Sequence, residues 1–410
     1  MLLDGSLLEP EFSEARAFEL QPARPAALIA PLSGAFDLAE SQSPGHAVRV
    51  AHIALTICSR LNLSAASRRT VLYASLLHDA GVAVAELPPG VNGDGGHTSA
   101  GAWVASRFGL DTEVQRTIAS THERWDGDGR PRGVSGEEIP IEARVINAAH
   151  WASDIAEGPE NPLRARAALQ KLHPRDVSGL AGPEIAEVLA EVVREDDTWT
   201  TMWDEQLAMM IAGQASGEGR ATVKNVERIA VAMGEVTDAS LREPGRSGRV
   251  AELATQLARR MGMPHSERRA VGVAARLLDI GQLGVPRHIT EKPAILSLEE
   301  MELMRHHPGL GARLIEHVPG MVEVAQWVHA HHERLDGRGY PDMLDSYEIP
   351  LASRILAVAD SYWALRADRP HRESFSDDEA REILEAGAGE RYDVDVVMML
   401  EPSLTEKVAS

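Results

Sequence analysis

The sequence predicts an all-α fold, arranged as two tandem helical bundles related by internal duplication. Apolar residues recur at intervals of three and four over residues 47–61 and 250–261, the spacing that gives a helix one buried face. Aromatic residues make up only 4% of the chain, and the alternating pattern typical of strands is scarce. A chain of 410 residues also exceeds what one hydrophobic core usually serves, so two domains are expected.

An internal repeat organises the chain. Residues 46–51 (HAVRVA) align with residues 246–251 (RSGRVA), and the segment LHDAGV that begins at Leu77 aligns with LLDIGQ that begins at Leu277, both at an offset of 200. A longer loop in the second copy then raises the offset to 210. At this offset three further pairs align: residues 97–101 with 307–311, 121–131 with 331–341, and 143–150 with 353–360. So many matches in one order indicate two diverged copies of one domain.

The join between the copies falls at residues 214–218 (QASGE) and the charged run that follows, a composition typical of a linker. The predicted organisation is an N-terminal arm over residues 1–30, a first copy over residues 31–219 and a second copy over residues 220–410. Because residues 1–30 lie outside the repeat, we expect a loose arm or a docking helix there.

The overall charge limits the classes of partner. The 62 acidic residues outnumber the 41 lysines and arginines, which gives a formal net charge of -21. This charge repels phosphate backbones and anionic bilayers, so neither nucleic acid nor a membrane is an expected partner. A small anionic, nucleotide-type ligand is still expected, because a bound cation inverts the local field.

The sequence has neither a second cysteine nor a recognisable secretory or membrane-spanning segment, and both points bear on its cellular compartment. Cys58 is the only cysteine, so no intrachain disulfide can form. The N-terminal segment carries acids where a secretory signal needs basic residues, and no apolar stretch approaches membrane-spanning length. We therefore expect a cytoplasmic protein.

Histidines and an aspartate of the first copy form a candidate metal centre. Imidazole and carboxylate together suit divalent transition metals, here iron or manganese ahead of nickel or zinc. Asp79 directly follows His78, and its two oxygens can bridge two cations while imidazoles complete each ion. Two such ions, about 3.5–4 Å apart, would clamp a phosphate and generate hydroxide from bound water. The candidate ligands are His46, His78, Asp79, His97, His122 and His150.

The second copy resembles the HD-GYP branch of the HD superfamily. The motifs that carry the resemblance are Leu278-Asp279, His307, His331-His332-Glu333, DGRGYP over residues 336–341, and Asp360. It covers residues 243–400 and, more weakly, residues 43–200 of the first copy. The resemblance implies helical domains that hold two or three metal ions, and many members of the branch hydrolyse cyclic di-GMP or related cyclic dinucleotides.

Departures from the family pattern differ between the copies. In the second copy Arg246 replaces the first metal histidine, Leu278 the histidine of the HD pair and Gln282 a phosphate-contacting lysine. The possible residual metal site there consists of Asp279, His307, His331, His332 and Asp360. We favour a different outcome, in which Arg246 forms salt bridges with the orphaned carboxylates, because an unpaired buried charge is costly.

The first copy keeps the HD pair but has Thr121, Val82 and Arg130 where the branch has histidine, lysine and tyrosine. It resembles the two-metal pattern of the wider HD superfamily. Asp79 and Glu123 are the candidate catalytic residues, with Glu123 or a nearby carboxylate orienting the ligands. Arg130 and Arg132 are candidate substrate-binding residues, since a guanidinium can replace a lost phosphate contact.

Three functions are compatible with these residues. The first is a metal-dependent phosphohydrolase, specifically a phosphodiesterase on a cyclic dinucleotide or another nucleotide, with catalysis in the first copy and a regulatory or structural second copy. The second is a catalytically impaired signalling module that binds a ligand, or a protein partner through the DGRGYP loop. The third is a di-iron oxygenase in the first copy, for which no residue argues directly.

Overall fold

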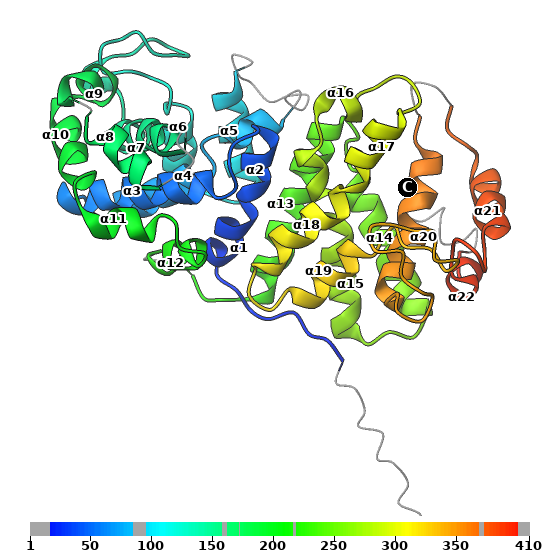
Figure 1. Ribbon diagram of the computed structural model, residues 1–410. Coiled ribbons are helices and arrows are strands. Elements are labelled where there is room, and N and C mark those ends of the chain that lie inside the picture. Colours follow the sequence, from blue (N-terminus) through cyan, green and yellow to red (C-terminus); the bar gives the residue numbers. More distant parts are fainter. Residues whose placement is uncertain are drawn as a thin grey trace, which may run out of the picture.

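The computed structural model describes residues 17–84, 96–157, 162–171, 173–215, 219–368 and 373–400. Within these ranges the regular structure is helical, and β-pairing is limited to two isolated bridges, Ala23–Thr222 and Ala388–Tyr392. The prediction of an all-α fold is confirmed (Figure 1). No helix in the described part of the chain is both long and apolar enough to cross a membrane.

The first half of the chain supplies α1 to α12. These elements are α1 (Pro25–Leu32), α2 (Gly34–Ala39), α3 (His46–Arg60), α4 (Ala65–Leu76), η1 (Ala80–Ala83), α5 (His97–Arg107), α6 (Thr112–Ile118), η2 (Gly136–Glu138), α7 (Ile141–Glu157), α8 (Pro162–Leu169), α9 (Pro174–Ala181), α10 (Pro183–Val192), α11 (Asp196–Thr201) and α12 (Leu207–Gly213).

The second half supplies the remaining elements. They are α13 (Val223–Leu241), α14 (Arg246–Arg260), α15 (His265–Leu277), η3 (Ile280–Gly284), α16 (Arg287–Thr290), α17 (Leu298–Arg305), α18 (His307–Glu316), α19 (Val322–His329), α20 (Leu351–Arg366), α21 (Asp377–Ala386) and α22 (Val394–Met398).

Helices recur between the halves in one order and at the offsets seen in the sequence. The series α3, α4, η1, α5, α6 and α7 corresponds to α14, α15, η3, α18, α19 and α20. The local signals recur as well. Gly45 and Gly245 precede α3 and α14 with φ of 84° and 76°, the left-handed region that glycine adopts without a Cβ clash. Asp37 and Asp238 then accept backbone N–H bonds from the first turns of these helices.

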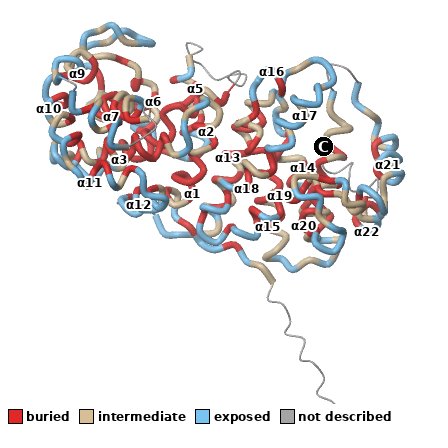
Figure 2. Tube along the Cα trace, viewed as in Figure 1, coloured by how far each residue is buried: buried red, intermediate tan, exposed pale blue. Residues whose placement is uncertain are grey.

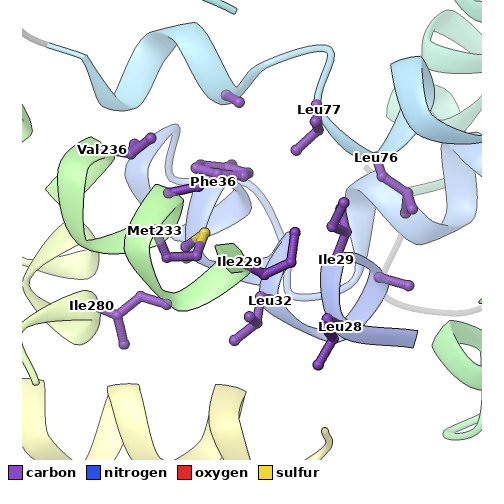
Figure 3. Close-up of a cluster of buried hydrophobic side chains, with 14 of the residues drawn as sticks. Leu28, Ile29, Leu32, Phe36, Leu76, Leu77, Ile229, Met233, Val236 and Ile280 are labelled. Atoms are coloured by element: carbon purple, nitrogen blue, oxygen red, sulfur yellow. The ribbon is translucent and has the colours of Figure 1, made fainter. Parts of the chain in front are cut away.

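The two halves meet across α1 and α2, which lie between them in Figure 1. A buried cluster joins the halves there: its labelled side chains are Leu28, Ile29, Leu32, Phe36, Leu76, Leu77, Ile229, Met233, Val236 and Ile280 (Figure 3). Buried residues continue from each bundle into this junction (Figure 2). Because its members come from both copies, their separation would expose a continuous apolar surface.

The expected N-terminal arm is closely packed where it is described; its residues 1–16 lie outside the described ranges. Residues 25–30 belong to α1, and Ala26, Leu28 and Ile29 of this helix are buried. Phe18 stacks edge-to-face on Trp327 of the second copy at 5.4 Å between ring centroids. This segment therefore ties the two copies together.

Candidate metal centre

Three elements of the first copy bring a compact group of candidate ligands together. His46 is the first residue of α3, His78 and Asp79 lie between α4 and η1, and His150 lies in the middle of α7. One ligand atom from each of these four residues lies within 4.8 Å of all the others. His46 and His78 are each 1% exposed and Asp79 is 6% exposed, so the group lies inside the bundle.

The outer nitrogens of two of these histidines are fixed by protein partners. His46 Nδ1 lies 2.8 Å from Glu157 Oε1, and His78 Nδ1 lies 2.8 Å from the carbonyl oxygen of Ser75. Each bond directs the Nε2 atom of its ring toward Asp79. Glu157 also accepts bonds from Arg49 and Ser153, which fixes its own position.

The atoms that face the centre lack ordinary hydrogen bonds. Within the described residues, His46 Nε2, His78 Nε2, Asp79 Oδ2 and His122 Nε2 are all buried without a hydrogen-bond partner. Leaving such groups unpaired costs about 1–3 kcal/mol each, so a cluster of them calls for a missing partner. A divalent cation matches three nitrogen lone pairs and a carboxylate oxygen, and the donor set therefore fits a metal.

His97 and His122 lie on the other side of Asp79. His122 Nε2 is 4.0 Å from Asp79 Oδ1, whereas His46 and His78 face Oδ2 at 3.9 and 2.7 Å. The rings of His97 and His122 are 4.6 Å apart at their centroids. The structure thus places predicted ligands near both oxygens of one carboxylate, although His122 and the exposed His97 both lie outside the compact group of four.

Electrostatics keep His78, His122 and Asp79 in the forms that bind metal. Burial lowers the pKa of His78, and burial together with His97 lowers the pKa of His122 to about 4, so both imidazoles are neutral at pH 7. Burial opposes ionisation of Asp79, but its interactions with His78 and His150 outweigh this and hold the pKa of Asp79 well below its usual range.

Glu123, predicted to be catalytic, directs its carboxylate away from this centre. Its oxygens accept backbone N–H bonds from Arg132 at 2.8 Å and Val134 at 3.1 Å, and the residue is fully buried. Glu333 accepts the corresponding backbone bonds in the second copy, from Asp342 and Leu344 among others. In both copies this glutamate folds the loop after the histidine segment, so its contacts are those of a loop anchor.

The two candidate substrate arginines lie on that loop. Arg130 is exposed, and its N–H bonds to the carbonyl oxygen of His122, as that of Tyr340 bonds to His332 in the second copy. Arg130 therefore occupies the place of the tyrosine of the DGRGYP motif. Arg132 is exposed as well and donates to Ser120 Oγ at 2.9 Å.

The second copy has an arginine where the first has a metal-facing histidine. Arg246 is 8% exposed and bonds to Asp279, to Asp360 at 2.5 Å and to Glu243 at 2.8 Å. The preferred sequence expectation, a salt bridge with the orphaned carboxylates, is what these contacts show. The guanidinium places a fixed positive charge between the two aspartates, which disfavours a metal cation between them.

Three histidines of the second copy still converge. Ligand atoms of His307, His331 and His332 lie within 4.8 Å of one another. His307 Nε2 is 3.4 Å from His331 Nε2 and 3.6 Å from Asp279 Oδ1. Asp279 and Asp360, predicted with them as a residual site, are instead bonded to Arg246, so only the imidazoles and one aspartate oxygen face a common point.

Sequence reasoning missed two carboxylates of the first centre. Glu157 orients His46, and Glu40 faces Asp79 from the end of α2. Burial and the negative charge of Asp79 raise the pKa of Glu40 to about 8. The repeat could not reveal either residue, because Glu157 aligns with Ala367 at the offset of 210 and Glu40 with Ser240 at the offset of 200.

Comparison with known proteins places this centre in a family. The family model described as "HD domain" matches residues 95–185 and 230–396, more than half of the chain. The chain therefore belongs to the HD domain family.

Relatives with a curated description are cyclic dinucleotide phosphodiesterases. The chain is 30% identical over 308 residues to 3'3'-cGAMP-specific phosphodiesterase 3 of Vibrio cholerae, covering 74% of this chain and 66% of the relative. It is 37% identical over 163 residues to a cyclic di-GMP phosphodiesterase of Thermotoga maritima, covering 38% and 44% respectively. A Xanthomonas campestris cyclic di-GMP phosphodiesterase response regulator is 37% identical over 147 residues, covering 35% and 39%. The chain thus spans less than two thirds of the length of each of these relatives.

One solved structure has the same fold. The crystal structure of a cyclic GMP-AMP-specific phosphodiesterase from V. cholerae superimposes with a TM-score of 0.68 at 24% sequence identity. The match covers 94% of this chain and 98% of that one, so both helical bundles and their arrangement are shared.

Proposed function

We propose that this chain is a metal-dependent phosphodiesterase acting on a cyclic dinucleotide, with the reaction centre in the first copy and a structural or regulatory second copy. The observation that carries the proposal is the group around Asp79, whose buried nitrogen and oxygen atoms converge without partners. The substrate class is suggested by the relatives, all three of which bear the names of cyclic dinucleotide phosphodiesterases.

The residues divide the work of such a centre between them. His46, His78 and His150 would hold one ion against Asp79, and His97 and His122 a second one, both iron or manganese ahead of nickel or zinc. When bound, the ions supply Lewis acidity toward the phosphoryl oxygens and activate a water. The protein itself contributes the orientation of a ligand and the binding of the substrate.

The carboxylate of Glu157 accepts a hydrogen bond from the Nδ1–H group of His46. This bond selects the tautomer whose Nε2 atom has a free lone pair, and it holds the ring with Nε2 facing the centre. Arg130 and Arg132 lie on the exposed loop after His122, where their guanidinium groups could take phosphate oxygens of a bound nucleotide. The reacting phosphate would then lie between this loop and Asp79.

Hydrolysis can be tested directly. Metal-replete protein is incubated with cyclic di-GMP and with 3'3'-cGAMP, and the linear products are separated by chromatography. We expect turnover that His78→Ala and Asp79→Asn each reduce at least a thousand-fold, while His265→Ala, an exposed histidine of α15, leaves it unchanged. Absence of turnover in metal-replete wild type, or full turnover in Asp79→Asn, would refute the proposal.

The bonds of Arg246 favour a second candidate function for the second copy. Since its aspartates are neutralised by an arginine, this copy would bind a ligand without hydrolysing it. A protein partner could instead use the DGRGYP loop, beside which Met343 and Tyr347 are 67% and 80% exposed. Retention of ligand by the Asp79→Asn variant would support the first of these roles.

A further inference from the structure

A cavity of about 550 Å³ lies at the junction of the two copies. Its walls come from α1, α2 and the start of α3, from residues 202–208 before and in α12, and from α18 of the second copy. None of the candidate metal ligands lines it. Pockets that bind small molecules commonly measure roughly 300–1,000 Å³, lie between domains, and combine a mostly apolar lining with a few polar groups. This cavity has that size, that position and that kind of lining.

Trp203 gives the cavity an aromatic wall. The residue is 38% exposed, and the guanidinium carbon of Arg49 lies 5.3 Å from the centroid of its ring. Arg49 is itself buried, and bonds to Ser43, Pro44 and Glu157 hold it in place. A ring that a fixed cation supports, and that is still accessible, can stack on a second planar ring.

Arg313 brings a positive charge to the same cavity from the second copy. It lies on α18 and is exposed, and within the described residues its guanidinium forms no salt bridge. A guanidinium binds a carboxylate or phosphate through two parallel N–H groups. The acidic residues of the lining, Asp204 and Glu205, belong to the first copy, so an anionic group is favoured on the side of α18.

We propose that this cavity is a regulatory site for a small aromatic anion, whose ring stacks on Trp203 and whose acidic group binds Arg313, and that its occupancy strengthens metal binding in the first copy. A nucleoside monophosphate and an aromatic carboxylate share this chemistry. The effect on metal binding rests on the proposed function, whereas the binding site itself does not.

Arg49 connects the cavity to the metal centre. Its Nε atom donates to Glu157 Oε1 at 3.1 Å, and the same oxygen lies 2.8 Å from His46 Nδ1. A ligand stacked on Trp203 restricts the side chain that Arg49 contacts, and through Arg49 it restricts the carboxylate that orients His46. By linkage, a ligand that tightens metal binding is itself bound more tightly when the metal is present.

Binding is measured by isothermal titration calorimetry on the full-length chain. Guanosine 5'-monophosphate and 1-naphthoate are the aromatic anions, and 1-naphthylmethanol and 1-naphthylmethylamine are the neutral and cationic analogues. We expect at least one anion to bind, and both analogues to bind at least ten-fold more weakly than 1-naphthoate if that anion binds. Asp79→Asn and chelator-treated wild type should keep the anion binding, which separates this cavity from the metal centre.

Two variants locate the site. Trp203→Ala removes the stacking surface and Arg313→Ala removes the guanidinium, so each should weaken anion binding at least ten-fold. Both residues are exposed, and we expect neither variant to unfold at a lower temperature than wild type. Arg259→Ala, an exposed arginine at the end of α14 that does not line the cavity, is the matched control and should bind like wild type.

A chelator titration tests the link to the metal. Wild type and Trp203→Ala are loaded with Mn²⁺ and titrated with a chelator of known affinity, with and without saturating anion. We expect the anion to raise the Mn²⁺ affinity of wild type at least five-fold and to leave that of Trp203→Ala unchanged.

The outcomes separate the parts of the inference. No binding of either anion to wild type, or binding that Trp203→Ala and Arg313→Ala leave unchanged, would overturn the site. Equally tight binding of the neutral or cationic analogue would overturn the choice of an anion. An unchanged Mn²⁺ affinity in the presence of bound anion would overturn the regulatory role. A wild type that binds the anion but no Mn²⁺ would overturn the proposed function and the regulatory role, and would leave the binding site standing.

Discussion

Replacing Arg246 with methionine removes the charge that holds the second copy's aspartates together. The side chain is almost fully buried and bonds to Asp279, Asp360 and Glu243. Methionine fills much of the same space with an apolar chain but leaves the carboxylates without a cation. Breaking a buried ion pair from one side typically costs about 3–5 kcal/mol, so we expect a loss of about that size in the free energy of unfolding at pH 7.

The size of the loss should depend on pH. Burial alone would raise the pKa of Asp279, but the charges of Arg246 and nearby imidazoles bring it down to about 2. Burial raises the pKa of Asp360 to about 6, and the charge of Arg246 limits that rise. Without the arginine both pKa values increase. A folded-state pKa above the unfolded one gives stability as the pH falls through it, so the difference between variant and wild type should shrink between pH 8 and pH 5.

Urea unfolding followed by circular dichroism at pH 8, 7 and 5 measures this difference. Arg259→Met, an exposed arginine at the end of the same helix, controls for the loss of a surface charge and should change stability by less than about 0.5 kcal/mol. A destabilisation of Arg246→Met below about 1 kcal/mol at pH 7, or one that stays constant down to pH 5, would refute the view that this arginine serves as the counter-ion of the aspartates.

Three further outcomes are expected. The double variant Arg246→His, Leu278→His restores the two nitrogen ligands that the second copy lacks, so elemental analysis should find additional metal per chain; unchanged content would contradict the view that the arginine excludes an ion. Burial opposes ionisation of Glu157, but bonds from His46 and other neighbours lower its pKa to about 2, so it stabilises the fold above the unfolded value of 4.5 and that stability is lost as the pH falls toward 2. In metal-free protein, the free energy of unfolding of Glu157→Gln should therefore fall less than that of wild type between pH 7 and pH 2, by roughly 3 kcal/mol at most. A pH dependence identical to wild type would disprove this. Glu123→Gln removes the charge from two backbone hydrogen bonds and should destabilise the first copy by about 1–3 kcal/mol in thermal unfolding; an unaltered melting temperature would show that the loop does not depend on it.

Residue identity and spacing were sufficient to predict the helical class, the repeat and most of the candidate metal centre. Helical periodicity is a local property, and the two copies confirm each other because α3 and α14 begin 200 residues apart. His78 and Asp79 are adjacent in the sequence, so their proximity required no tertiary information. The salt bridges of Arg246 could also be anticipated, since an arginine in place of a metal-binding histidine can neutralise the aspartates that the missing metal leaves unpaired.

Only the tertiary structure revealed the carboxylates of the first centre that have no aligned counterpart in the second copy. Glu40 and Glu157 have no charged counterpart in the second copy, and they reach the centre because α2 and the end of α7 pack beside α3. The carboxylate of Glu123 accepts hydrogen bonds from the backbone of the loop that follows it, and the sequence motif does not reveal this. The sequence by itself determined which ligand types are available and in what order. Only the packing of the helices determined which carboxylates face the metal centre, because those contacts join segments far apart in the chain whose orientation depends on how the apolar surfaces fit.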